Sequence, residues 1–324
     1  MTESTKKLNI FFRILILLSV CMYFLSFFNI TNAGNFSIRN DLALGSVILS
    51  IGLLIIICIS LYYVNDSFFF ISKNPERLPI LYLSLVLLSP NVILFSKYHV
   101  LALLLIWNLY FEVQYLAKEI KPSGSLLVGV SLLAISVLIE PAMLWLLVLT
   151  IPYKLKLLRG SHFKYLIITL GAIFLSLFWY VGLSFISHPE IETIKNLWIH
   201  FSNQLTDIRI GDYNYKIYEL LLLTIIILIY ILSRVKLLPR LKNSFNLARS
   251  RAFKISSLYG IIIILLLIIY NSDLFSAASL LVFIPLVLLF FDYIELSIEK
   301  IETRVLLLAL WGLIIVHRFT YLFM

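Results

Sequence analysis

The chain has 324 residues, of which 61% are hydrophobic and 13% are charged, and its mean hydropathy is +1.02. A soluble domain carries about 25% charged residues, so this composition excludes an ordinary soluble protein. The formal net charge of +9 comes from basic residues beside apolar runs, which is typical of membrane-flanking loops and not of a nucleic-acid surface. Cys21 and Cys58 both lie inside apolar runs, so they predict no disulfide and no metal site.

Apolar runs recur along the whole chain, and a run of about 20 residues can cross a bilayer as a helix. We therefore expect an all-α, polytopic transmembrane bundle of about eleven membrane segments, forming one domain over residues 1–324. The expected helices are Ile10–Ile30, Leu42–Val64, Pro79–Phe95, Val100–Ala117, Ser125–Ile139, Ala142–Ile151, Tyr165–Ile186, Ile217–Ser233, Ile255–Tyr270, Phe275–Tyr293 and Val305–Phe323.

The stretch Ser125–Ile151 is apolar except for Glu140, which Pro141 follows directly. A proline inside a helix costs about 3 kcal/mol, and a glutamate at membrane depth about 2.5–3.5 kcal/mol. The pair predicts either a kink with a functional acid or the apex of a short hairpin. A single crossing would move the basic clusters Lys154–Lys164 and Arg234–Lys254 outside and reverse the positive-inside bias. We therefore predict the hairpin. Its arms, roughly 22 and 15 Å long, are shorter than the thickness of the membrane core, which is about 30 Å.

The hairpin sets the predicted topology, with a cytoplasmic N-terminus and an external C-terminus in a bacterial inner membrane. The basic residues that then lie on the external side of the membrane are Arg39, Lys97, Lys195, Arg209, Lys216 and Arg318. All other lysines and arginines face the cytoplasm, including Lys154 in a basic loop.

The longest external loop, residues 187–216, carries apolar residues at steps of three and four, which indicates an amphipathic helix. These residues are Ile191, Ile194, Trp198, Phe201, Leu205 and Ile208. The helix is expected to lie in the outer interface, and a lid over the bundle without chemistry is the alternative. This loop separates a helical core at 9–186 from a C-terminal four-helix part at 217–324.

Three runs between Leu78 and Leu183 read LYLSLVLLSPNVILFSKYHVLALLLIWNLYFEVQYLAKE, SGSLLVGVSLLAISVLIEPAMLWLLVLTIPYKLKLLRG and KYLIITLGAIFLSLFWYVGL. Their order of helix pair, short hairpin, basic loop and helix with an aromatic pair resembles the core of GT-C-type membrane glycosyltransferases. The resemblance implies transfer of a sugar from polyprenyl phosphate at the outer face of the membrane. The whole chain, with FIPLVLLFFDY late in it, also resembles a polytopic inner-membrane family of Bacteroidota, which implies no particular activity.

The GT-C resemblance implies an essential acid in the first external loop. Here that loop is Thr31–Asp41, and its only acid is Asp41. Asp41 is thus the candidate general base for an acceptor hydroxyl. The alternative is a helix N-cap, because an aspartate directly before an apolar run satisfies free N–H groups. The next external loop, Ser96–His99, has no acid, and Glu140 stands where many GT-C members have lysine.

Five further residues are candidates for substrate binding. Glu140 could hold a substrate or an internal cation, or reach interfacial water as an apex residue. Lys97, Arg39 and Arg209 could grip a lipid phosphate or anchor the protein to headgroups. His99 is the best-placed external histidine or, alternatively, a satisfied polar residue.

The expected partners are membrane lipid, a polyprenyl-phosphate-linked sugar and other membrane proteins, without nucleic acid, metal or cofactor. Besides a glycosyltransferase, the sequence leaves open a non-enzymatic subunit or scaffold of an envelope complex, and a transporter. A transporter typically shows broken helices in two related halves, and one break is evident here.

Overall fold

The computed structural model describes the chain in separate segments, and every structural statement below concerns these residues. They are residues 10, 13, 14, 17, 21, 28–30, 36–38, 44–68, 77–88, 96–117, 123–157, 162–187, 196, 199, 202, 203, 221, 223–232, 235, 247–270, 281, 284, 285, 287 and 301–322.

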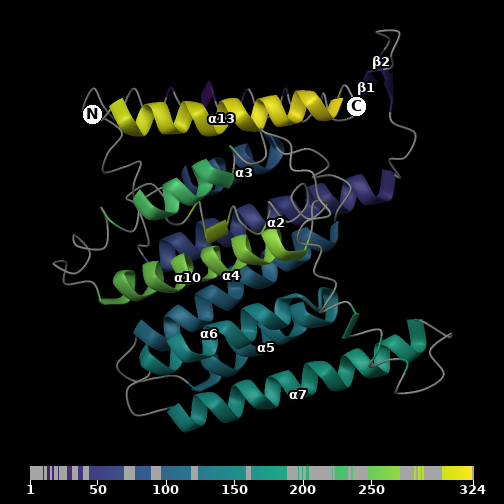
Figure 1. The fold of residues 1–324 in the computed structure, drawn as a ribbon, viewed down its shortest axis with the longest axis vertical. Helices are drawn as coiled ribbons and strands as arrows, with labels where there is room; N and C mark the ends of the chain where they lie inside the picture. The colour runs from purple at the N-terminus through teal and green to yellow at the C-terminus, as the bar shows by residue number, and fades with distance from the viewer. Residues whose placement is uncertain are drawn as a thin grey trace.

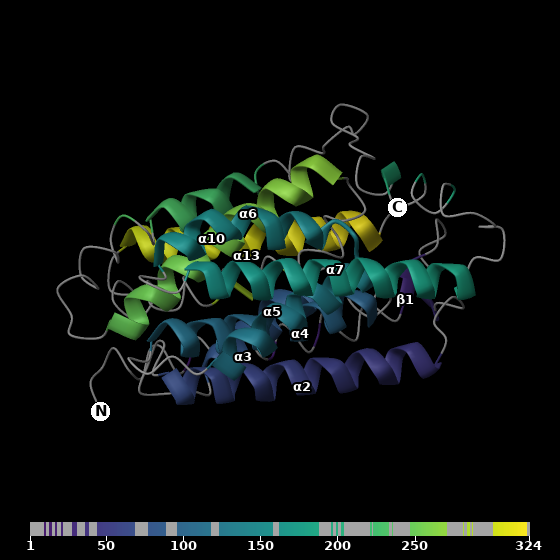
Figure 2. The same cartoon turned by 90° about the horizontal axis from the view of Figure 1, so that it is seen from below.

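Helices make up nearly all of the described chain, so the expected all-α class is confirmed for this part. The helices lie side by side, with α13 at one edge and α7 at the other (Figure 1). Their axes also run in a common direction in the perpendicular view (Figure 2). The long helices are α2 (Leu44–Phe68), α3 (Arg77–Leu88), α4 (Ser96–Ala117), α5 (Ser123–Ile139), α6 (Met143–Leu157), α7 (His162–Ser187), α10 (Leu247–Tyr270) and α13 (Ile301–Leu322).

One predicted helix is wrong at its C-terminal end. The helix expected over Ile10–Ile30 gives way to the strand β1 (Phe28–Ile30), which pairs antiparallel with β2 (Phe36–Ile38). Phe28 lies opposite Ile38 and Ile30 opposite Phe36. Aromatic and β-branched residues favour strands, and a second such run, separated from the first by five residues, supplies the backbone partners that a strand needs.

The hairpin is present, with its turn at Glu140–Pro141. The Glu140 N–H donates to the Ser136 carbonyl at 2.9 Å as the last bond of α5, and the Met143 N–H donates to the Glu140 carbonyl at 2.9 Å across the turn. Figure 1 shows α5 and α6 next to one another, between α4 and α7. The chain therefore folds back at this point instead of continuing through it.

The second arm of the hairpin is longer than predicted. Helix α6 does not end at Ile151 but continues to Leu157, with Pro152 inside it. Pro152 is exposed while Lys154 is buried. Proline removes one backbone hydrogen bond from a helix, and the turn that follows Pro152 is joined to α4 through the ion pair of Lys154 with Glu112.

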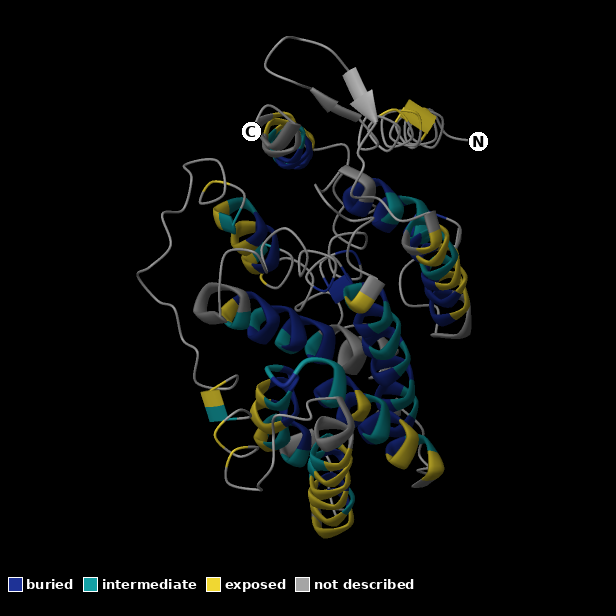
Figure 3. Cartoon of the chain, turned by 90° about the vertical axis from the view of Figure 1, so that its right-hand side faces the viewer, coloured by how far each residue is buried: buried dark blue, intermediate teal, exposed yellow. Residues whose placement is uncertain are grey.

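Two described helices are long and apolar enough to cross a membrane. They are Val47–Asn65 in α2 and Phe163–Gly182 in α7, with mean hydropathies of 2.7 and 1.9. Only 33% and 22% of these windows are buried, whereas a core helix of a soluble protein would be mostly buried. Helix α7, at the bottom of Figure 3, exposes much of its length, including Phe163, Phe174 and Phe178.

Helix α4 lies at the centre of the described bundle and packs against α2, α5 and α10. Its buried apolar residues belong to one core cluster with residues of all the other long helices. A polar side chain on the inner side of α4 therefore meets several helices at once, and this arrangement positions the site.

Candidate functional site

Helix α4 and the α5–α6 hairpin carry opposite charges at both ends of their contact. Helix α4 has Lys97 in its first turn and Glu112 near its C-terminus, while the hairpin has Glu140 at its apex and Lys154 near its base. Both pairs form. The Lys97 Nζ lies 2.6 Å from Glu140 Oε2, and the Lys154 Nζ lies 2.5 Å from Glu112 Oε1. The two ion pairs thus join the hairpin to α4 at two points about 22 Å apart along the helix, given a rise of 1.5 Å per residue.

The apex pair is open to its surroundings. The Lys97 side chain is 46% exposed and that of Glu140 is 20% exposed. The Lys97 ammonium also lies 5.7 Å from the centre of the Tyr98 ring, within the range of a cation–π contact. Two residues predicted separately as substrate-binding are therefore partners in one ion pair.

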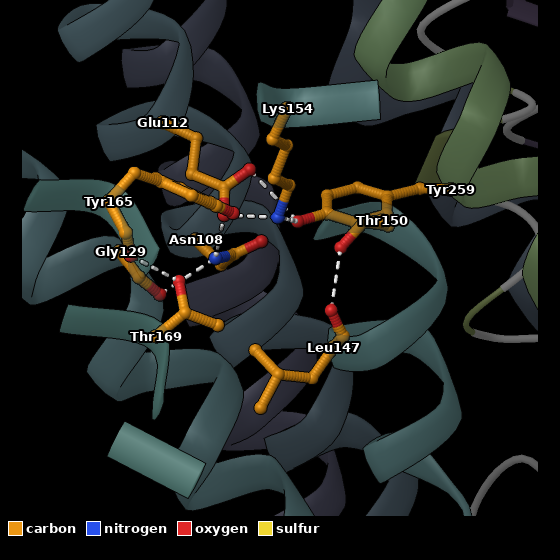
Figure 4. Close-up of polar contacts among 9 residues, drawn as sticks. All are labelled: Asn108, Glu112, Gly129, Leu147, Thr150, Lys154, Tyr165, Thr169 and Tyr259. Carbon is orange, nitrogen blue, oxygen red and sulfur yellow. Dashed lines mark hydrogen bonds and ion pairs between the residues drawn. The ribbon is translucent and has the colours of Figure 1, made fainter. Parts of the chain in front are cut away.

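The second pair is buried, with side chains that are both 2% exposed. Tyr259 of α10 completes it (Figure 4). The Tyr259 hydroxyl accepts a hydrogen bond from Lys154 at 2.6 Å and donates one to Glu112 Oε2 at 2.9 Å. The Lys154 ammonium also lies 4.9 Å from the centre of the Tyr259 ring. Ammonium, carboxylate and phenol close a triangle that joins α4, α6 and α10.

Asn108 extends this cluster to α5. Its amide nitrogen donates to Glu112 Oε1 at 3.1 Å and to the Gly129 carbonyl at 2.7 Å. A Cβ on Gly129 would lie 3.2 Å from the Glu112 Cγ, so the glycine allows α5 to approach α4 closely here. From α7, Tyr165 reaches the same cluster (Figure 4) and is buried. Five helices therefore meet at one polar centre.

The buried Glu112–Lys154 pair needs further hydrogen bonds to be stable. Taking an ion pair out of water carries a large desolvation penalty, which only good geometry and further hydrogen bonds offset. The Glu112 carboxylate has three donors, Lys154, Asn108 and Tyr259. A carboxylate engaged in this way is not a free general base, so the buried cluster acts as a polar cross-link between helices.

Glu112 and its partners were not predicted from the sequence. Glu112 does stand inside an expected helix, Val100–Ala117, and an ionisable residue within a membrane span is a functional candidate by default. Lys154 was expected in a basic cytoplasmic loop, and the loop is wrong. Lys154 lies in α6, and it can be buried there because it forms an ion pair with Glu112. No sequence pattern marks Tyr259.

The structure places the predicted site residues unequally. His99 was expected in an external loop, Ser96–His99, and this is wrong. Helix α4 already begins at Ser96, so His99 lies one turn into the helix, where it is fully buried. Asp41, Arg39 and Arg209 lie outside the described residues.

The predicted amphipathic segment in the external loop is described only in part. Residues 196, 199, 202 and 203 are helical, and the apolar residues of the predicted stripe lie outside the described chain.

In the described part of the chain, no group of three or more His, Cys, Asp or Glu residues could hold a metal ion. The chain matches no protein-family model, no curated protein and no solved structure. In the part of the chain that the structure describes, the class is a helical bundle with two helices long and apolar enough to cross a membrane, built around a buried ion pair.

Proposed function

We propose that the protein is a multi-pass protein of the bacterial inner membrane that handles a lipid-linked glycan at the outer face. Among the described residues, two helices of spanning length and the shorter apolar helices of α3, α5, α6, α10 and α13 support a membrane location. The bias of lysine and arginine supports a cytoplasmic N-terminus and an external C-terminus. About eleven membrane segments would then make up the whole chain.

The Lys97–Glu140 pair carries this proposal. In the predicted topology it lies at the outer end of the bundle, beside the hairpin apex, and its ammonium is partly exposed. An exposed ammonium is a suitable ligand for a lipid phosphate, since Lys binds phosphate as a point charge. The site would therefore hold the phosphate of a polyprenyl-phosphate sugar while its lipid chain lies along the exposed apolar helices.

A GT-C-like glycosyl transfer is the reaction that we propose for this site. The acceptor hydroxyl would give its proton to Asp41 while its oxygen bonds to the anomeric carbon of the sugar. The bond from that carbon to the phosphate oxygen would break, leaving polyprenyl phosphate on Lys97. The role of Asp41 comes from the sequence resemblance, and Arg39 and Arg209 would be further cations near the phosphate.

A non-enzymatic membrane subunit that binds the same lipid is the second candidate, and one observation favours it. Glu112 and Glu140 are the acids whose side chains the structure describes, and both are engaged in ion pairs. Neither is therefore a free base in this state. Replacement of Asp41 by asparagine would separate the two functions, because asparagine caps a helix about as well as aspartate but cannot accept the proton.

Binding of polyprenyl phosphate to the purified protein in phosphatidylcholine nanodiscs tests the shared part of both candidates. We expect Lys97→Gln to weaken binding by about 10- to 100-fold, since a hydrogen bond to a charged group contributes about 1.5–3 kcal/mol. Lys164→Gln is the matched control, because Lys164 is an exposed lysine of α7 outside the site. Equal affinity of the wild type and Lys97→Gln would refute the proposed phosphate site.

A further inference from the structure

Of the two lysines that bind carboxylates in the described bundle, Lys97 is the one whose partner can be exchanged. Lys154 is 2% exposed, and its acceptors Glu112 and Tyr259 are themselves joined by a hydrogen bond. Removing one member of a buried pair lowers the folding equilibrium constant on the order of 10²–10⁴-fold. An exposed ion pair raises the folding equilibrium constant by a factor between one and about five. With 46% and 20% exposure, Lys97 and Glu140 are closer to the second case.

We propose that Glu140 is an internal competitor for the phosphate site. In the protein without ligand, the Glu140 carboxylate forms an ion pair with the Lys97 ammonium. When an anionic phosphate group binds, it replaces the carboxylate as the partner of Lys97. The identity of the phosphate as that of a polyprenyl lipid rests on the proposed function. Glu140 then keeps the site closed to weak anions and does not bind the substrate itself.

The local structure permits this exchange without unfolding the hairpin. The turn is held by backbone hydrogen bonds from Glu140 to Ser136 and from Met143 to Glu140, in which the Glu140 carboxylate takes no part. A change of its side-chain rotamer is therefore enough to release Lys97. The ring of Tyr98 stays near the ammonium and partly compensates its charge while the partners exchange.

The size of the effect follows from the fraction of protein in which Lys97 is free. When a ligand binds only the competent state, its apparent affinity is reduced by the population of that state. An exposed ion pair that adds up to about fivefold leaves at least a sixth or so of the molecules open. Loss of the carboxylate also removes its repulsion of the phosphate. We therefore expect Glu140→Gln to tighten binding by about 2- to 10-fold.

Titration of polyprenyl phosphate into the full-length protein in phosphatidylcholine nanodiscs provides the test. The expected order of affinity is Glu140→Gln above wild type, and wild type above Lys97→Gln. The double variant should bind as weakly as Lys97→Gln, because the competitor matters only while the ammonium is present. Glu140→Asp keeps the charge on a shorter side chain that reaches Lys97 less well, so it should bind more tightly than the wild type and no more tightly than Glu140→Gln.

Inorganic phosphate, titrated in the same way, distinguishes the two sources of the anion. We expect it to bind the Glu140→Gln variant more weakly than polyprenyl phosphate does, since it lacks the apolar chain that adds buried area. Equal binding of both ligands would overturn the lipid assignment and leave a site for free phosphate.

The failures of the two proposals can be told apart. If Lys97→Gln weakens binding but Glu140→Gln fails to tighten it, Glu140 is not a competitor, and the phosphate site itself stands. If Lys97→Gln has no effect, the phosphate site is refuted, and the competitor role with it. Each variant is compared as a monodisperse, folded protein, and Glu140→Asp replaces Glu140→Gln as the decisive variant if the latter is not folded.

Discussion

The buried Glu112–Lys154 pair gives the sharpest prediction about stability. Lys154→Met keeps the length of the side chain but leaves the Glu112 carboxylate buried with Asn108 and Tyr259 as its remaining donors. Loss of one partner of a buried pair typically costs about 3–5 kcal/mol, because the remaining charge is not compensated. We therefore expect a large fall in the free energy of unfolding. The matched control is Lys97→Met at the exposed pair, where about 0–1 kcal/mol is expected.

The measurement is the midpoint of thermal or denaturant unfolding in detergent, for both variants and for Glu112→Leu/Lys154→Met. The double variant removes both charges and should recover part of the loss, since a buried ion pair can often be replaced by apolar residues. Recovery should be incomplete because the hydroxyl of Tyr259 and the amide of Asn108 lose partners, at about 1–3 kcal/mol for each unsatisfied group. Similar losses for Lys154→Met and Lys97→Met would refute the assignment of a buried, stabilising pair.

Two further predictions concern packing and topology. Gly129→Ala should destabilise the protein by about 1–2 kcal/mol, because its Cβ would lie 3.2 Å from the Glu112 Cγ and the three hydrogen bonds of the Glu112 carboxylate keep that atom from shifting. Gly171→Ala in α7 should be neutral or slightly stabilising, because the added Cβ would meet no described atom within 4 Å apart from its own stretch of helix; unfolding midpoints that fail to separate the two would contradict this reasoning. For topology, single cysteines are placed in a background without the two native cysteines and treated with an impermeant thiol reagent in intact cells. Lys97→Cys should be labelled and Lys164→Cys protected, and the reverse pattern would invert the proposed orientation.

The sequence by itself determined where most of the helices lie. The runs expected as Val100–Ala117, Ser125–Ile139 and Tyr165–Ile186 appear as α4, α5 and α7 with ends shifted by a few residues. Apolar length and the breaks between runs are local properties, so they can be read without knowing the fold. The turn at Glu140–Pro141 was predictable for the same reason, since both residues are unfavourable within an apolar helix.

Only the tertiary structure decided what the charged residues do. Lys154 follows a proline and belongs to a basic stretch, yet it is buried because Glu112, 42 positions away in sequence, receives it. Tyr259 completes the triangle from 105 and 147 positions away. Likewise, the residues of β1 became a strand because β2 offered them hydrogen bonds. Desolvation of a charge depends on every side chain packed around it, and the order of residues along the chain does not specify those neighbours.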